Sequence, residues 1–243
     1  MRLRYQLDGS ASEPVLALPS SLGTSLELWS ENIPYWSDTY CVLSYDQPGR
    51  RTIAELGQDF IGLLDEIGID RVSYCGLSLG GATGMWLGAN APERIESLVL
   101  ACTSARFGEP EQWLERAALV RERGLEPIAD SIVARWFTPA EGSDTLERFR
   151  EQLVATPREV YAACCEALAA WDFRDELTTI RAPTLVIAAA EDTATPPEHA
   201  EQIARALGTT KVVLPYAAHL ANVEQPQAFS VLVAKHLAQV EVI

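Results

Sequence analysis

One serine of this chain stands in a pattern typical of an enzyme nucleophile. The segment Gly76-Leu77-Ser78-Leu79-Gly80 has the spacing G-x-S-x-G, after a strand-like run at 71–75 and before a helical pattern at Leu79–Asn90. Glycines let the strand and the helix approach closely, so that the turn presents the Ser78 hydroxyl at the edge of a sheet. We therefore predict Ser78 to be a nucleophile, although glycine-rich turns between a strand and a helix also bind phosphate.

A serine hydroxyl is a weak nucleophile at neutral pH and needs a general base. The chain has three histidines, of which His199 falls at a predicted helix start and His236 on an expected solvated helix face. His219 instead follows the predicted strand Lys211–Leu214 in a loop. Loops at the carboxyl ends of strands collect catalytic groups in open α/β sheets. The sequence thus favours His219 as the base.

The base in turn needs a carboxylate that holds its tautomer and stabilises the imidazolium. Asp192 follows the predicted strand Thr184–Ala189, and the adjacent Glu191 is an alternative. Asp46 precedes the serine, which breaks the order Ser, Asp, His that α/β-hydrolases follow. We predict Asp192 for this role, although an aspartate in this segment also suits a helix N-cap.

Two backbone N–H groups should stabilise the negative charge that develops on the attacked carbonyl. One belongs to Leu79, directly after the nucleophile. For the other we predict Leu22, in the loop 19–24, because a turn at Gly23 would direct this N–H inward. Losing one such donor costs roughly 10²–10³ in rate.

Short apolar runs that predict strands alternate with longer helical patterns. The predicted strands are 3–7, 15–18, Cys41–Tyr45, 72–75, 97–102, Thr184–Ala189 and Lys211–Leu214. The predicted helices are Ile53–Ile67, Leu79–Asn90, 199–207 and 227–240. Several strands are apolar throughout, as expected for parallel strands covered on both faces. The alternation predicts an α/β fold with an open, mostly parallel, twisted sheet flanked by helices.

The middle of the chain breaks this alternation. Residues 107–177 show helical periodicity and no convincing strand, which predicts about four helices. We interpret them as a helical cap inserted over the carboxyl edge of the sheet, with residues 1–106 and 178–243 as the core. The alternative is that these helices are simply a further part of the helical scaffold around the sheet.

Composition limits the classes of function. The 243 residues are 48% hydrophobic and 22% charged, with a net charge of −15, so neither nucleic acid nor an anionic membrane surface is an expected partner. No signal-peptide core or membrane-length apolar run is present. The odd number of cysteines, without CxxC spacing, argues against a disulfide framework or a metal site and favours the cytoplasm. The cysteines are Cys41, Cys75, Cys102, Cys164 and Cys165.

Segments spread over nearly the whole chain resemble those of 3-oxoadipate enol-lactonases, which are α/β-hydrolases. These segments are Ser20-Ser21-Leu22-Gly23-Thr24 with Trp29, Cys75-Gly76-Leu77-Ser78-Leu79-Gly80-Gly81, Asn90-Ala91-Pro92-Glu93-Arg94, Arg135-Trp136-Phe137-Thr138-Pro139, Tyr161-Ala162-Ala163-Cys164-Cys165, Asp192-Thr193-Ala194-Thr195-Pro196-Pro197 and Ala217-Ala218-His219-Leu220-Ala221-Asn222-Val223-Glu224-Gln225-Pro226. The resemblance includes the cap, where hydrolase families diverge most. It implies the α/β-hydrolase fold and a triad of Ser78, Asp192 and His219.

The same resemblance implies a reaction. It is the hydrolysis of 3-oxoadipate enol-lactone, a small anionic lactone, to 3-oxoadipate in aromatic catabolism, through an acyl-enzyme and with no metal or organic cofactor. An anionic substrate in a protein of charge −15 needs a cationic anchor. Arg135 is our candidate, with Trp136 beside it as a pocket residue. Nothing in the sequence predicts an oligomeric state.

Other functions remain open at this point. A broad carboxylesterase or a cofactor-free perhydrolase would use the same triad, and a receptor with the hydrolase fold would keep the pocket for binding alone. The chain also departs from the family pattern between Asp46 and Ile53, where a longer glycine-rich loop is usual. Either this is a true deletion, or a flexible stretch is missing from the sequence.

Overall fold

The computed structural model describes residues 3–240, so that residues 1–2 and 241–243 of the predicted core lie outside the described range. Seven strands in this range form one sheet in the order β1-β3-β2-β4-β5-β6-β7. The strands are β1 (Tyr5–Asp8), β2 (Val15–Pro19), β3 (Cys41–Tyr45), β4 (Val72–Leu77), β5 (Ile95–Ala101), β6 (Thr184–Ala189) and β7 (Lys211–Leu214). Only β1 at one edge is antiparallel to its neighbour, so the prediction of a mostly parallel sheet is confirmed.

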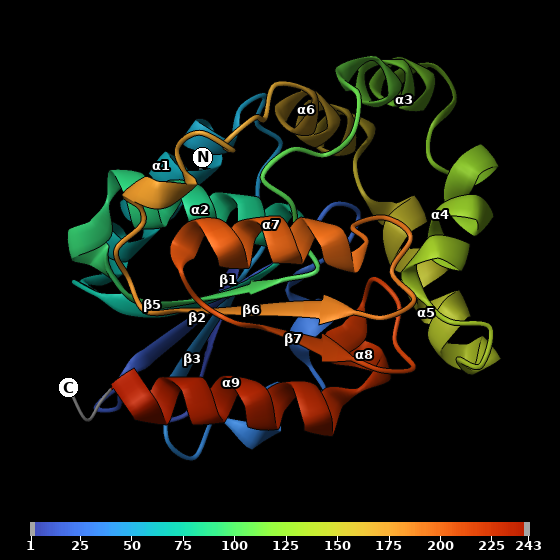
Figure 1. Cartoon of the computed structure of the whole chain (residues 1–243). Coiled ribbons are helices and arrows are strands. Elements are labelled where there is room, and N and C mark those ends of the chain that lie inside the picture. Colours follow the sequence, from blue (N-terminus) through green and yellow to red (C-terminus); the bar gives the residue numbers. More distant parts are fainter. Residues whose placement is uncertain (1–2, 241–243) are drawn as a thin grey trace.

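Two layers of helices cover the sheet (Figure 1). Helices α1 (Ile53–Ile67), α2 (Leu79–Asn90) and α7 (Pro197–Leu207) lie on one face, and α9 (Pro226–Val240) lies on the other. The side chains of a strand alternate between these faces, which explains the continuous apolar runs. Leu16 and Leu18 of β2 join the core cluster that contains α9 residues, whereas Ala17 joins the cluster under α1, α2 and α7.

The loop before α1 is short and closed by its own contacts. Thr52 caps the helix by accepting from Glu55 N, while the Glu55 carboxylate accepts from Thr52 N. Arg50 makes an ion pair with Asp59, one turn and a half into the helix. These contacts connect β3 to α1 through a short, well-anchored loop.

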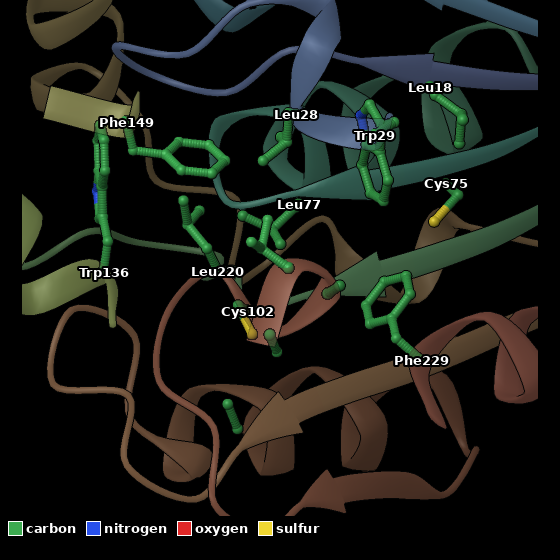
Figure 2. Packing of buried hydrophobic residues seen from close by; sticks show 14 of the residues in the cluster. Leu18, Leu28, Trp29, Cys75, Leu77, Cys102, Trp136, Phe149, Leu220 and Phe229 are labelled. Carbon is green, nitrogen blue, oxygen red and sulfur yellow. The ribbon is translucent and has the colours of Figure 1, made fainter. Parts of the chain in front are cut away.

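Between β5 and β6 the described chain forms α3 (Pro110–Arg123), α4 (Ala129–Trp136), α5 (Ser143–Ala155) and α6 (Arg158–Ala169). Helices α4 and α5 lie beyond the tips of the β6 and β7 arrows (Figure 1), where a cap over the carboxyl edge would lie, and α3 packs against α6 above them. Figure 2 shows how the cap joins the core: Trp136 stands beside Phe149, with Leu220 next to them. We still propose residues 107–177 as the cap.

The remaining elements are short. They are the four-residue helix α8 (Ala221–Glu224) and 3-10 turns at Leu26–Trp29, Ile33–Tyr35, Pro92–Arg94, Glu126–Ile128 and Leu177–Thr179. Among the described residues no helix combines the length and the apolar character that crossing a membrane requires.

Candidate active site

The turn between β4 and α2 carries a strained serine. Ser78 has φ 56° and ψ −115°, a region that residues with a side chain rarely adopt and that costs about 1–3 kcal/mol. Two contacts hold it there: Ser78 N donates to Ala101 O at 2.9 Å, and Thr103 Oγ1 donates to Ser78 O at 2.7 Å. A Cβ at Gly76 would lie 2.3 Å from Gly80 O, which is why no larger residue fits this turn.

The structure brings together the three side chains that the sequence singled out. His219 Nε2 lies 2.9 Å from Ser78 Oγ, and His219 Nδ1 lies 2.9 Å from Asp192 Oδ2. All three residues are buried: Ser78 is 8% exposed, His219 5% and Asp192 3%. Bulk water therefore hardly weakens these hydrogen bonds. The three residues come from the ends of β4, β6 and β7, which meet at the carboxyl edge of the sheet (Figure 1).

The Asp192 carboxylate is fully engaged. Oδ1 accepts from Ala194 N at 2.8 Å and Thr195 N at 2.9 Å, while Oδ2 accepts from Thr195 Oγ1 at 2.6 Å as well as facing His219. Burial acts to raise the pKa of Asp192. The charge and hydrogen bond of His219 and the donors of Thr195 outweigh burial, so the pKa lies below its usual value. Asp192 is therefore ionised at neutral pH, as the partner of an imidazolium must be.

The alternative acids and bases lie elsewhere. Glu191 is exposed, and Asp46 accepts from Leu26 N at 2.6 Å, which gives it a structural role. The expectation of a solvated face for His236 is wrong: the side chain is half-buried, and desolvation lowers its pKa. His199 lies in the first turn of α7.

The two predicted oxyanion donors lie at the expected turns. Leu79 is the first residue of α2, where an N–H has no partner within the helix. Gly23 has φ 76°, and the turn is closed by Thr24 N donating to Ser21 O and Ser21 N to Thr24 Oγ1. These bonds leave the N–H of Leu22 without an acceptor within residues 3–240. Their role as an oxyanion hole remains our proposal.

A pocket lies over Ser78 between the sheet edge and the cap. It is lined by Ser21, Leu22, Thr24, Ser78, Phe107, Trp113, Arg116, Ile132, Arg135, Trp136, Tyr161, Leu168, Ala194, Thr195, His219 and Leu220. Both residues predicted from the sequence to contact substrate, Arg135 and Trp136, are in this lining. Trp136 is buried and Arg135 is exposed, and no ion pair among the described residues includes Arg135. The lining contains no carboxylate.

Sequence reasoning missed two groups at this site. Arg116 lines the pocket from α3, and its guanidinium carbon lies 4.7 Å from the centre of the Trp113 ring. The i,i+3 spacing of Trp113 and Arg116 is the sequence signal that would have suggested this contact. Gln47 is the other: its side chain bridges Ser20 O and Thr83 Oγ1 and so ties the Leu22 loop to α2.

One carboxylate joins the base-bearing loop to the cap. Glu224 Oε2 accepts from Ala218 N at 2.6 Å, next to His219. Glu224 Oε1 accepts from Thr138 N at 2.8 Å and Thr138 Oγ1 at 2.6 Å, just beyond the end of α4. Glu224 thus positions His219 relative to the helix that carries Trp136.

Replacing Glu224 by alanine should lower the free energy of unfolding by about 2–3 kcal/mol, because three donors lose a charged acceptor. It should also lower kcat, since the His219 loop becomes loose. Urea unfolding and steady-state kinetics measure both effects. Gln225→Ala is the matched control, because this neighbouring side chain makes only an exposed bond to Tyr216 O. Equal unfolding midpoints for the two variants would contradict the role assigned to Glu224.

The cysteines offer no competing nucleophile. All five are buried and none forms a disulfide. Burial raises the pKa of Cys164 to about 11 and that of Cys165 to about 12, so both remain neutral thiols at pH 7.

Comparisons with known proteins found similarity along nearly the whole chain. A model of the alpha/beta hydrolase family matches residues 17–231. The chain is 40% identical over 240 residues to 3-oxoadipate enol-lactonase 2 of Acinetobacter baylyi, covering 94% of this chain and 90% of that protein. A solved hydrolase from Pseudomonas aeruginosa is 43% identical with a TM-score of 0.93, over 97% of this chain and 94% of that one. The enol-lactonase from Burkholderia xenovorans is 37% identical with a TM-score of 0.94, over 97% and 96%.

Proposed function

The chain belongs to the alpha/beta hydrolase family, and we propose that within it the protein is a 3-oxoadipate enol-lactonase, which hydrolyses 3-oxoadipate enol-lactone to 3-oxoadipate. The likeness to an enol-lactonase over 94% of the chain carries this proposal, because it includes the cap as well as the sheet. The cap supplies half of the residues that line the pocket over Ser78, including both of its arginines, so it selects the substrate. A cytoplasmic location is part of the proposal and is supported by five cysteines that form no disulfide.

The first half of the reaction forms an acyl-enzyme. Ser78 Oγ attacks the lactone carbonyl while His219 Nε2 takes its proton, and Asp192 stabilises the imidazolium. The N–H groups of Leu22 and Leu79 would hold the oxyanion. When the tetrahedral intermediate collapses, the ring C–O bond breaks and an enolate leaves. An enolate is a better leaving group than an ordinary alkoxide.

The second half releases the product. The His219 imidazolium gives its proton to the enolate, which leaves His219 neutral, and the resulting enol becomes a ketone. His219 then removes a proton from water, which attacks the acyl carbonyl and restores the Ser78 hydroxyl.

The test is to follow the ultraviolet absorbance of the enol-lactone with the wild type and with Ser78→Ala. The same proteins are assayed on a neutral aryl ester. Rapid loss of absorbance that depends on Ser78 supports the proposal. Preference for the neutral ester would instead indicate a broad carboxylesterase, and failure of a fluorophosphonate to label Ser78 would indicate a receptor.

Arg135 is our proposed contact for the substrate carboxylate, with Trp136 beside it. Replacing Arg135 by alanine should weaken the kcat/KM for the anionic lactone roughly 10-fold, since one charge-assisted hydrogen bond is lost near solvent. Hydrolysis of a neutral aryl ester should fall far less. Equal losses on the two substrates would remove Arg135 from this role.

A further inference from the structure

The charges around the pocket differ in sign from those of the whole protein. The chain has a net charge of −15, yet no aspartate or glutamate lines the pocket. Apart from His219, its charged lining side chains are Arg116 and Arg135. Most arginines in residues 3–240 pair with carboxylates, including Arg121 on the same helix as Arg116. Arg116 and Arg135 have no such ion pair among the described residues, so the pocket wall carries positive charge that no neighbouring carboxylate neutralises.

Arg116 is the better placed of the two. It is half-buried, whereas Arg135 is exposed. Its guanidinium stacks on Trp113, and the Trp113 indole is itself fixed by donating to Phe107 O. The guanidinium is planar by resonance, and its contact with the Trp113 ring restricts the orientation of that plane, which favours binding of a carboxylate.

Arg116 also contacts the floor of the pocket. Tyr161 of α6 is buried and lines the same pocket; burial raises the pKa of its hydroxyl, while the nearby positive charge of Arg116 acts in the opposite direction. The Tyr161 ring reaches the Leu22 turn, because a Cβ at Gly23 would lie 3.1 Å from Tyr161 Cε2. Arg116 is thus linked through one side chain to the loop that we propose for the oxyanion.

We propose that Arg116, held by Trp113 and Tyr161, is the inner carboxylate-binding residue of the pocket and sets its preference for anionic over neutral acyl substrates. This inference rests on the proposed function for the identity of the substrate. Arg135 then acts at the rim, and its removal has the smaller effect. An uncompensated, partly desolvated cation gains most from a carboxylate ligand, because the ligand supplies the missing charge partner.

The test compares the enol-lactone with its neutral methyl ester, which has the same scissile bond. Arg116→Gln should lower the ratio of kcat/KM values, anionic over neutral, roughly 10- to 100-fold. Arg116→Lys should restore part of the ratio, since it returns the charge without the planar fork. Arg123→Gln is the matched control: it removes the same charge from an exposed site on the same helix.

A ratio for Arg116→Gln equal to that of Arg123→Gln would overturn the proposal, as would a larger loss in Arg135→Gln. Fluorophosphonate labelling of each variant shows whether the site has folded, and Arg116→Lys keeps the test valid if Arg116→Gln does not fold.

If the wild type opens neither lactone, the proposed function fails. Arg116 is then tested through inhibition of aryl-ester hydrolysis by pentanoate against pentanamide. Selective loss of pentanoate inhibition in Arg116→Gln supports the carboxylate site, and unchanged inhibition refutes it.

Discussion

Ser78→Ala is expected to lower kcat for the enol-lactone by about 10⁶-fold, because it removes the only oxygen placed 2.9 Å from His219 Nε2 among the described side chains. The oxyanion donors and the pocket remain, so a residual rate of roughly 10³-fold over water should persist. Absorbance assays at saturating substrate, continuous for the wild type and discontinuous over long times for Ser78→Ala, measure kcat over this range of rates. Activity within 100-fold of the wild type would mean that another group is the nucleophile.

A second substitution separates chemistry from backbone strain. Ser78→Gly also lacks the nucleophile, but glycine tolerates φ 56°. Glycine relieves about 1–3 kcal/mol of backbone strain in the folded protein. It also destabilises the folded protein by about 0.4–1 kcal/mol, because it gives the unfolded chain more conformational freedom, and this second effect is the smaller one. Ser78→Gly should therefore be more stable than Ser78→Ala by about 1 kcal/mol in urea unfolding. If both variants are inactive and Ser78→Gly is the more stable of the two, the turn holds the serine under strain.

Asp192→Asn should lower kcat about 10⁴-fold while the fold survives. Oδ1 accepts two backbone N–H groups, from Ala194 and Thr195, so an asparagine must keep its oxygen there. Its NH₂ group then faces His219 Nδ1 and donates to it. The ring proton moves to Nε2, which points at Ser78 and can no longer accept the serine proton.

Thr195→Val is the control for this prediction. It removes the hydroxyl that donates to Asp192 Oδ2 at 2.6 Å but leaves the Thr195 N–H in place. One lost hydrogen bond to a charged acceptor should cost roughly 10- to 100-fold at most. An Asp192→Asn variant no slower than Thr195→Val would contradict the assignment of Asp192, and thermal unfolding of both variants excludes a folding defect.

Several elements could be predicted to the residue. Strands β3, β6 and β7 and helices α1 and α2 have the bounds that their apolar patterns indicate. Turn and capping residues end these patterns sharply: Gly68, in the left-handed region at φ 72°, ends α1. Strand β5 was predicted less well, because Cys102 leaves the strand with φ 42° although its side chain is apolar.

The triad was predictable for a related reason. The nucleophile turn is a local motif, and His219 and Asp192 each follow a recognisable strand. Parallel strands bring their carboxyl ends to one edge, so chain order and strand ends were sufficient to select three residues separated by up to 141 positions.

Other features depended on contacts between distant segments. The link from Glu224 to Thr138 spans 86 positions, and the contact of Arg116 with Tyr161 joins two cap helices. The half-buried state of His236 likewise reflects packing of α9 on the sheet. Thr138, Glu224 and His236 carry no local pattern that distinguishes them from solvated surface residues.

The amino-acid sequence alone therefore determined the class of fold and the reacting groups, since backbone propensity, glycine freedom and strand alternation act over a few neighbouring residues. The tertiary structure alone decided that Arg116 joins Arg135 in lining the pocket, which carboxylate ties the cap to the base and which histidine is desolvated. Those properties are sums of short-range forces between side chains that only the packed chain brings within a few ångströms.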